Sequence, residues 1–344
     1  MKRICGLFIL LFLSLSLLGQ TEHVLFIGNS FTLNHQMPKK LAQIAQNEGK
    51  TMFVDQATKG GMDWQYHATN PVTYQKIKAE PWTYVVLQGK SYEPLLDSAT
   101  VESTTKKYGK MIIDSIRFYA PNAKIMLFMT WGYKDGIFLK ENQEFINYTE
   151  MQNRLKKKYL NFADEFNVAV TPVGEIWQQF YKENPGINLY DKDNYHQSVV
   201  GSFLVASSFY TMIYQKPIMN FKNLPYTISE MEARKVAEKA RDVITNPKYD
   251  WRTNNWEKEL PDNFALFDYK IKKDSLYLNS TVPEEYDVKW KIDGKTVSKD
   301  PKVAIPLTTN EEFEVQIIVK EGILRNRKKE DALYQIQRQL VPNE

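Results

Sequence analysis

The chain has 344 residues, with 45 Lys and Arg, 41 Asp and Glu, and a single cysteine, Cys5. A formal net charge of +4 gives no reason to expect nucleic acid as a partner, and one cysteine excludes a disulfide framework within the chain. Stability must therefore come from a packed core, and at this length two domains are expected rather than one.

Residues 1–19 have the features of a secretory signal peptide. Lys2 and Arg3 precede the apolar stretch ICGLFILLFLSLSLLG, and small or polar residues follow near Gly19. These features predict cleavage near Gly19 and export to the periplasm, the cell surface or the medium. The alternative, an N-terminal membrane anchor, would need a longer apolar run. Cleavage would also remove Cys5, leaving 43 of the 45 basic side chains against 41 acidic ones and no thiol nucleophile.

Strand-like and helical stretches alternate from residue 20 to residue 245. The apolar run HVLFIG precedes MPKKLAQIAQNEGK, which has apolar residues at helical spacing. TMFVDQA and TYVVLQG are the next expected strands, and the helical stretch TTKKYGKMIIDSIRFYA follows. KIMLFMTW is a fourth strand, a long helical run covers residues 146–166, and NVAVTPVG is a fifth strand. This alternation predicts a parallel sheet with helices on both faces, which binds ligands at the carboxyl ends of its strands.

The pattern changes after residue 245. Residues 246–262 are rich in Asn, Pro and Trp without a clear period, which indicates a connector, and Trp251 and Trp256 favour a packed one. Residues 263–344 contain four strand-like stretches: FALFDYKIKKDSLYLNSTV, YDVKWKIDGKTV, KVAIPLTT and EFEVQIIVKEG. Their alternation and an Asp-Gly turn predict a small C-terminal β-sandwich-like module, which either binds glycan or braces the first domain.

Ser30 stands where the first strand ends, in HVLFIGNSFT. A serine there can cap a helix, or it can act as a nucleophile if a base removes its proton. His196 lies in a polar loop that enters an apolar helix, and Asp193 stands three residues before it. That spacing lets the carboxylate bind one imidazole nitrogen and leaves the other free, as in a serine triad. Asp-x-x-His is also common by chance, and His35 and His67, in loops after the first two strands, could approach Ser30 as well.

Two further loops offer donors for a developing oxyanion. ATKGGMDW, after the second strand, contains Gly60 and Gly61, whose backbone N–H groups can approach a bound group closely because no Cβ is present. Taken alone, this is an ordinary tight turn. VVLQGKS places Gln88 at the end of the third strand, where its amide can donate into the crevice or tie down a loop. Together with Ser30 and His196, these residues fall where an open α/β sheet collects its active site.

Over roughly residues 22–245 these stretches resemble, in the same order, the sequence blocks of the SGNH (GDSL-like) hydrolases. FIGNSFT resembles the first block, with Ser30 as nucleophile, and DNYH matches the last, with His196 as base and Asp193 as its partner. QATKGGM resembles the second, whose glycine N–H serves the oxyanion hole; Gly60 is preferred there over Gly61. The resemblance implies a three-layer α/β/α fold and ester hydrolysis through an acyl-enzyme, in a poorly characterised branch of exported bacterial proteins.

The chain departs from that family at two positions. Asn29 stands where the family usually has Asp, a position that mainly shapes the turn. The usual third block, Gly-x-Asn-Asp, is replaced by LQGKS. Sialate O-acetylesterase-like relatives carry Gln-Gly-Glu there, with the Gln as oxyanion donor. By that analogy Gln88 takes the donor role, and Ser91 is the second choice.

The sequence therefore predicts an exported serine esterase that removes O-acetyl groups from a carbohydrate. Ser30 would attack while His196 takes its proton, and the oxyanion would be held by the N–H groups of Ser30 and Gly60 and by the Gln88 amide. No metal or other cofactor, nucleic acid or integral membrane partner is expected, since no cluster has metal-ligand spacing. The alternatives are a lipase or thioesterase acting on another small acyl ester, and a non-catalytic glycan-binding or surface-assembly protein. Four aromatic residues after strand ends either form a wall that stacks on sugar or simply pack: Trp64, Tyr66, Trp131 and Tyr133.

Overall fold

The structure is a computed structural model that describes residues 21–141, 143–256, 267–272, 275–280, 286–307, 313–321 and 334–340. The predicted signal peptide, residues 1–19, and the last part of the predicted connector, residues 257–262, lie outside the described residues. Within the described ranges, no helix combines the length and the apolar character needed to cross a membrane.

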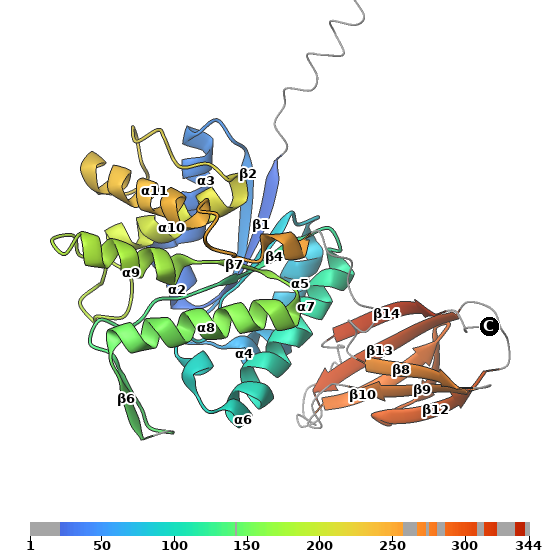
Figure 1. The fold of residues 1–344 in the computed structure, drawn as a ribbon. Helices are drawn as coiled ribbons and strands as arrows, with labels where there is room; N and C mark the ends of the chain where they lie inside the picture. The colour runs from blue at the N-terminus through green and yellow to red at the C-terminus, as the bar shows by residue number, and fades with distance from the viewer. Residues whose placement is uncertain are drawn as a thin grey trace, which may run out of the picture.

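Five parallel strands form the sheet of the N-terminal domain, in the order β2-β1-β3-β4-β7 (Figure 1). They are β1 (Glu22–Gly28), β2 (Met52–Thr58), β3 (Tyr84–Leu87), β4 (Lys124–Phe128) and β7 (Ala169–Thr171). β1 lies between β2 and β3, with Gly28 paired to Thr58 and Ile27 to Leu87. The chain therefore passes from β1 to β2 on one side and later forms β3 on the other side of β1. This change of direction opens a crevice at the carboxyl end of β1. The five predicted strands are confirmed.

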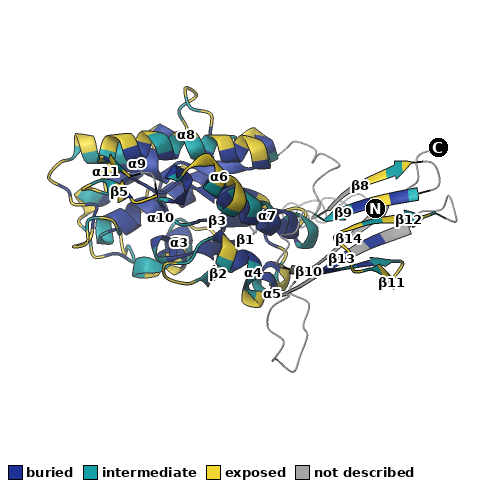
Figure 2. Ribbon diagram, turned by 90° about the horizontal axis from the view of Figure 1, so that it is seen from below, coloured by how far each residue is buried: buried dark blue, intermediate teal, exposed yellow. Residues whose placement is uncertain are grey.

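Helices cover both faces of this sheet, so the predicted three-layer α/β/α fold is confirmed (Figure 1). One face carries α3 (Met37–Asn47), α10 (Val199–Tyr214) and α11 (Glu230–Ile244), and the other carries α5 (Pro71–Ala79), α7 (Lys107–Tyr119) and α8 (Tyr148–Phe166). Phe26 of β1 and Phe128 of β4 pack edge-to-face on Phe209 of α10, with ring centroids 5.2 and 5.1 Å apart. Figure 2 shows the buried residues concentrated on the sheet and on the inner faces of the helices.

Shorter elements complete this domain: α2 (Ser30–Leu33), η2 (Asn34–Gln36), α4 (Trp64–Thr69), η3 (Glu93–Leu95), α6 (Ser98–Val101), the π-helical turn η4 (Glu102–Lys106), β5 (Ile137–Leu139), β6 (Glu144–Ile146), α9 (Val173–Glu183) and η5 (Thr253–Trp256). The helix predicted over residues 146–166 begins only at Tyr148. Ile146 instead pairs with Ile137 in the β5–β6 hairpin, and the Asn147 side chain caps the helix by accepting from the N–H of Glu150 (3.0 Å).

Residues 246–256 pack against the N-terminal domain. Trp251 is buried, and its indole N–H donates to the carbonyl of Val243 at 3.0 Å. The indole N–H of Trp256 donates to the carbonyl of Ile125 at 2.8 Å. The part of the predicted connector that is described is therefore packed, because the two tryptophans remove apolar surface from water.

The C-terminal module consists of antiparallel strands in two sheets, β11-β10-β13-β14 and β12-β9-β8. The strands are β8 (Phe267–Lys272), β9 (Ser275–Ser280), β10 (Tyr286–Ile292), β11 (Lys295–Ser298), β12 (Lys302–Pro306), β13 (Phe313–Glu321) and β14 (Tyr334–Leu340). Asp293 and Gly294, both at positive φ, form the turn between β10 and β11. Leu276 of one sheet and Trp290 of the other are buried. The strand β14 is an addition, since the sequence pattern did not identify it.

Candidate active site

Ser30, His196 and Asp193 form a chain of hydrogen bonds at the carboxyl edge of the sheet. Oγ of Ser30 lies 2.7 Å from Nε2 of His196, and Nδ1 of His196 lies 2.6 Å from Oδ2 of Asp193. Both distances are those of good hydrogen bonds. The candidate nucleophile, base and orienting acid thus meet, although 166 positions separate Ser30 from His196.

The turn after β1 leaves the Ser30 side chain available for His196. Asn29, rather than Ser30, caps α2, because its side-chain oxygen accepts from the N–H of Phe31 at 3.1 Å. Gly28 is required just before it, since a Cβ there would lie 2.6 Å from Oγ1 of Thr32 and 2.7 Å from a Gln88 oxygen. The alternative of Ser30 as a helix cap is therefore excluded.

Asn29 also joins the three loops that surround Ser30. Its Nδ2 donates to the carbonyl of Met62 at 2.8 Å and to the carbonyl of Gly89 at 3.3 Å. Met62 follows β2 and Gly89 follows β3, so one side chain connects the turn after β1 with both neighbouring loops. An ionised Asp can only accept hydrogen bonds and would face two carbonyl oxygens here. The departure from the family's usual Asp therefore does more than shape the turn.

The loop before α10 fixes the orientation of His196. Asp193 accepts from the backbone N–H groups of Tyr195 (3.1 Å) and His196 (2.9 Å) as well as from the His196 ring. Partial burial acts to raise the pKa of Asp193, but these hydrogen bonds outweigh it and hold the pKa below its usual range. Asp193 therefore stays ionised and keeps the proton of His196 on Nδ1, which leaves Nε2 to accept the proton of Ser30. Ser198 caps the helix that follows, accepting from the N–H of Gly201 at 3.1 Å.

Backbone donors stand beside the nucleophile. The N–H groups of Ser30 and Gly61 donate to no other group within the described part of the chain. Gly61 lines the pocket in front of Ser30, and its φ of +74° is in the left-handed region that favours glycine. Gly60, preferred from the sequence, precedes this position and does not line the pocket. The geometry therefore favours Gly61 as the donor from this loop.

Gln88 lies beneath the nucleophile turn, fully buried. Its side-chain oxygen accepts from the backbone N–H of Asn29 at 2.8 Å and from the hydroxyl of Thr32 at 3.1 Å, and its amide nitrogen donates to the carbonyl of Gly89. Gln88 does not line the pocket. This geometry gives no support to the expected oxyanion role of Gln88 and makes it a support for the turn that carries Ser30.

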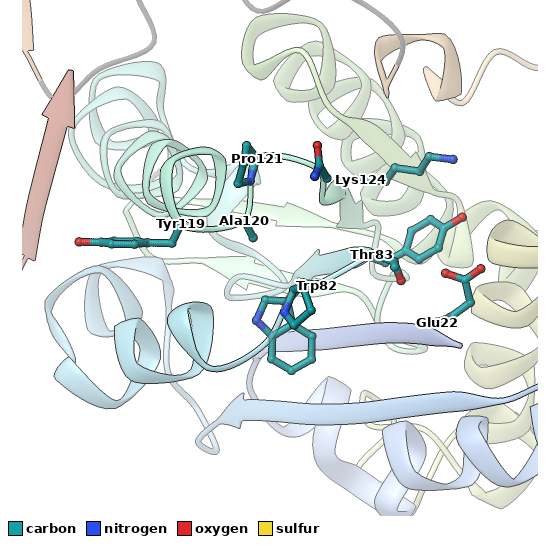
Figure 3. Close-up of a pocket in the computed structure, with 10 residues that line it drawn as sticks. Glu22, Trp82, Thr83, Tyr119, Ala120, Pro121 and Lys124 are labelled. Atoms are coloured by element: carbon teal, nitrogen blue, oxygen red, sulfur yellow. The ribbon is translucent and has the colours of Figure 1, made fainter. Parts of the chain in front are cut away.

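A pocket of 340 Å³ opens in front of Ser30 and His196, near the lower end of the range for small-molecule sites. Its other lining residues are Asn29, Phe31, Gly61, Lys90, Ser91, Tyr92, Tyr133, Ile137 and Tyr195. A larger pocket of 440 Å³ lies at the opposite edge of the sheet, among Glu22, Trp82 and Lys124 at the amino ends of the strands (Figure 3). Parallel sheets bind ligands at the carboxyl ends, which favours the pocket at Ser30.

Ser91 and Tyr133 line this pocket as a pair. The Oγ of Ser91 lies 2.5 Å from the hydroxyl oxygen of Tyr133. Burial raises the pKa of Tyr133 to about 12, so the phenol is neutral and keeps a proton that it can donate. When Tyr133 donates to Ser91, the hydroxyl proton of Ser91 is left to point into the pocket. Ser91, the second choice from the sequence, is therefore placed to act as a donor.

Of the four aromatic residues proposed as a sugar-binding wall, Tyr133 alone lines the pocket. Trp64 and Trp131 are buried in the core, and Trp131 stacks on Trp177 with ring centroids 4.0 Å apart. Tyr66 lies within α4 and is half-buried. Three of the four therefore pack, which was the alternative that the sequence left open.

Two tyrosines that the sequence analysis did not single out take their place. Tyr195 stands inside the DNYH block, with 37% of its surface exposed and its ring centroid 4.2 Å from that of His196. Tyr92 directly follows Ser91 and lines the pocket as well. Each lies next to a candidate catalytic residue in the sequence, and this proximity is the feature that could have identified them as pocket residues.

The two other histidines near Ser30 bind backbone carbonyls. Nε2 of His67 lies 3.0 Å from the carbonyl oxygen of Gly28, and Nε2 of His35 lies 3.0 Å from that of Gln197. Burial lowers the pKa of His67 to about 4, so this ring is neutral at ordinary pH. Neither histidine contacts Ser30, and His196 is the base that the geometry supports.

No protein-family model matches the chain, and no curated protein matches its sequence. Solved structures do resemble it. A DUF4886 family protein from Bacteroides uniformis has a TM-score of 0.57 and 18% identity, covering 67% of this chain and 97% of its own. A putative SGNH hydrolase from Slackia heliotrinireducens (TM-score 0.44, 22% identity) and an acetyl xylan esterase (TM-score 0.43, 16% identity) each cover 56% of this chain, and 98% and 99% of their own. The chain has a three-layer α/β/α fold, which it shares with the DUF4886 family protein.

Proposed function

We propose that the protein is a serine esterase that cleaves a small acyl ester through an acyl-enzyme. The observation that carries the proposal is the continuous relay from Ser30 through His196 to Asp193, with distances of 2.7 and 2.6 Å, at the mouth of a pocket. The N–H groups of Ser30 and Gly61 beside it, which donate to no other described residue, support the same reaction class.

In the proposed mechanism, Oγ of Ser30 attacks the ester carbonyl carbon while Nε2 of His196 takes the serine proton. The N–H groups of Ser30 and Gly61 and the hydroxyl of Ser91 hold the oxyanion, each worth about 3 to 4 kcal/mol of barrier. His196 gives its proton to the leaving alcohol. It then removes a proton from water as the water attacks the acyl carbon, and it returns this proton to Oγ of Ser30 as the bond between the acyl carbon and Oγ breaks and the acid leaves.

The substrate we propose is an O-acetylated carbohydrate outside the cytoplasm. A pocket of 340 Å³ suits a short acyl group better than a long chain. Tyr92, Tyr133 and Tyr195 line it and combine apolar ring faces with hydroxyl groups, a combination that suits the C–H faces and hydroxyls of a sugar. Cleavage of the predicted signal peptide would export the enzyme to where extracellular glycans are accessible.

The test is hydrolysis of p-nitrophenyl esters by the purified protein and its Ser30→Ala variant. The acetate should be cleaved faster than the octanoate, and the variant should lose at least about 10⁴-fold in kcat. Its melting temperature should stay near that of the wild type, because Asn29 caps α2. A Ser30→Ala variant that keeps a tenth or more of the activity would exclude the serine mechanism. A preference for octanoate would favour a lipase, and inactivity on all esters would favour the non-catalytic alternative.

A further inference from the structure

The β5–β6 hairpin, which lies between β4 and α8 along the chain, projects from the N-terminal domain (Figure 1). Phe138 pairs with Phe145 across the two strands, so their side chains lie on the same face. Leu139 and Ile146 are 1% exposed, whereas Phe138 and Phe145 are 53% and 62% exposed. The hairpin therefore packs one apolar face and leaves two adjacent phenylalanines in water.

This exposed pair is unusual for a face with no structural task. Burial of a phenylalanine side chain stabilises a protein, yet here two neighbouring phenylalanines are each more than half exposed. The surrounding side chains are polar and exposed: Lys140, Glu141 and Gln143. An apolar patch with a polar rim is typical of a binding surface.

The hairpin begins at the wall of the candidate active site. Ile137 lines the pocket of Ser30. Its neighbour Gly136 lies against the Phe145 ring, because a Cβ on Gly136 would come within 3.0 Å of Cζ of Phe145. Phe138 directly follows Ile137, so the exposed pair lies near the base of the hairpin, with the Phe138 side chain on the face opposite to that of Ile137.

The same base is joined to the catalytic loop and to α8. Asn194, between Asp193 and His196, donates through Nδ2 to Asp135 at 2.9 Å, and its carbonyl accepts from the N–H of Lys134 at 2.9 Å. On the second strand, Arg154 of α8 donates twice to Glu144, at 2.9 and 2.7 Å. The hairpin is therefore held by the segment just before β5 and by β6, in a fixed position relative to the pocket.

We propose that Phe138 and Phe145 form a platform for the carbohydrate chain that carries the ester, binding sugar units outside the pocket. This inference rests on the proposed esterase function. A pocket of 340 Å³ has room for the acyl group and little more than one sugar, so a polymer has to continue beyond it. Aromatic rings in a polar surround match a sugar chain, with its apolar C–H faces and polar edges.

The charge around the platform favours a neutral glycan over an anionic membrane. Lys134 and Lys140 are balanced by Asp135 and Glu141 along the hairpin. Binding to anionic lipid would call for an excess of basic side chains on this surface.

The experiment compares a small ester with polymers in the double variant Phe138→Ser/Phe145→Ser. On p-nitrophenyl acetate, kcat/KM should stay within twofold of the wild type. Acetate release from the best substrate among acetylated xylan, acetylated glucomannan and O-acetylated peptidoglycan should fall about tenfold or more, mainly through KM. Phe138→Trp/Phe145→Trp should keep polymer activity. Met231→Ser on α11, 59% exposed, is the matched control and should change neither.

Equal losses on small ester and polymer, or no loss on polymer, would overturn the platform. So would a wild type that cleaves p-nitrophenyl acetate and deacetylates none of the polymers. A dimer that dissociates in the double variant with unchanged polymer kinetics would assign the pair to a second copy of the chain. Binding to phosphatidylglycerol vesicles that the double variant loses would assign it to a membrane. Inactivity of the wild type on every ester would instead overturn the esterase proposal itself.

Discussion

The two halves of the candidate active site are built in different ways. The half that moves the proton takes Asp193 and His196 from one loop and needs only Ser30 from elsewhere. The half that faces the oxyanion is assembled from the loops after β1, β2 and β3, which meet through the Asn29 side chain. The relative position of two groups three residues apart in one turn is set largely by that turn. The positions of donors from separate loops depend instead on which side chains pack between those loops and connect them.

The largest expected effect lies in the first half, with Asp193→Asn. The amide cannot hold the protonated Nδ1 of His196 as a carboxylate does, so Nε2 loses its role as acceptor for Ser30. We expect kcat on p-nitrophenyl acetate to fall about 10⁴-fold, with KM close to that of the wild type.

Asp191→Asn is the matched control for that substitution. Asp191 is exposed in the same loop, and among the described residues its side chain accepts only from the backbone N–H of Lys192 (2.8 Å), through an oxygen that Asn keeps. Its kcat should be unchanged. If the kcat of Asp193→Asn fell by less than tenfold, Asp193 would not be the residue that orients His196.

The next effect separates two candidate donors in the second half. Ser91→Ala should lower kcat about 10²- to 10³-fold and should cost less stability than Gln88→Met, because water in the pocket can replace the lost hydroxyl beside Tyr133. Gln88→Met should lower the free energy of unfolding by about 1 to 3 kcal/mol, because it leaves the buried N–H of Asn29 and the Thr32 hydroxyl without an acceptor. Steady-state kinetics and urea unfolding of both variants measure the two effects.

The opposite pattern would restore the interpretation drawn from the sequence. A Ser91→Ala variant within threefold of the wild type, with a Gln88→Met variant that is fully stable and has a strongly reduced kcat, would make Gln88 the oxyanion donor. Tyr133→Phe refines the test, since it removes the hydroxyl 2.5 Å from Ser91 and should cost less than Ser91→Ala.

The fold could be predicted well because buried parallel strands read as short apolar runs between helical stretches. Ser30 and the Asp193–His196 pair could be predicted for a related reason, since their loops follow strand ends or carry a short motif. The β5–β6 hairpin was not predicted, because strands of three residues are too short to show a recognisable alternation of apolar and polar residues.

The residues that donate to the oxyanion could not be predicted as completely from the sequence. Gln88 has the right chemistry for a donor, yet the backbone N–H of Asn29 is buried and must be satisfied, and the Gln88 side chain does this. Trp64 and Trp131 follow strand ends as expected, but their large apolar surface draws them into the core. Competition of this kind depends on three-dimensional neighbours, which spacing along the chain does not specify.

A further expected effect concerns stability alone, as a pH dependence in the oxyanion half. Glu93 follows Tyr92 in the loop after β3 and is 8% exposed. Burial, and then the negative charge of Asp63, raise the pKa of Glu93 to about 7 from an ordinary value of 4.5. Between these pH values the folded protein holds a proton that the unfolded chain has released. The Glu93 contribution to the free energy of unfolding should therefore fall by roughly 2 to 3 kcal/mol as pH rises through this window.

Urea unfolding of the wild type and Glu93→Gln at pH 5 and pH 8 measures this contribution as a difference. The difference is needed because buried His67 has the opposite slope: its lowered pKa makes stability fall as pH drops from 6.5 towards about 4. The Gln variant mimics the protonated acid, so it should match the wild type at pH 5 and exceed it by roughly 2 kcal/mol at pH 8. Glu238→Gln, at an exposed position on α11, should show no such divergence. Parallel curves for wild type and Glu93→Gln would mean that Glu93 is ionised at little cost, and that the oxyanion half tolerates a buried charge near Asp63.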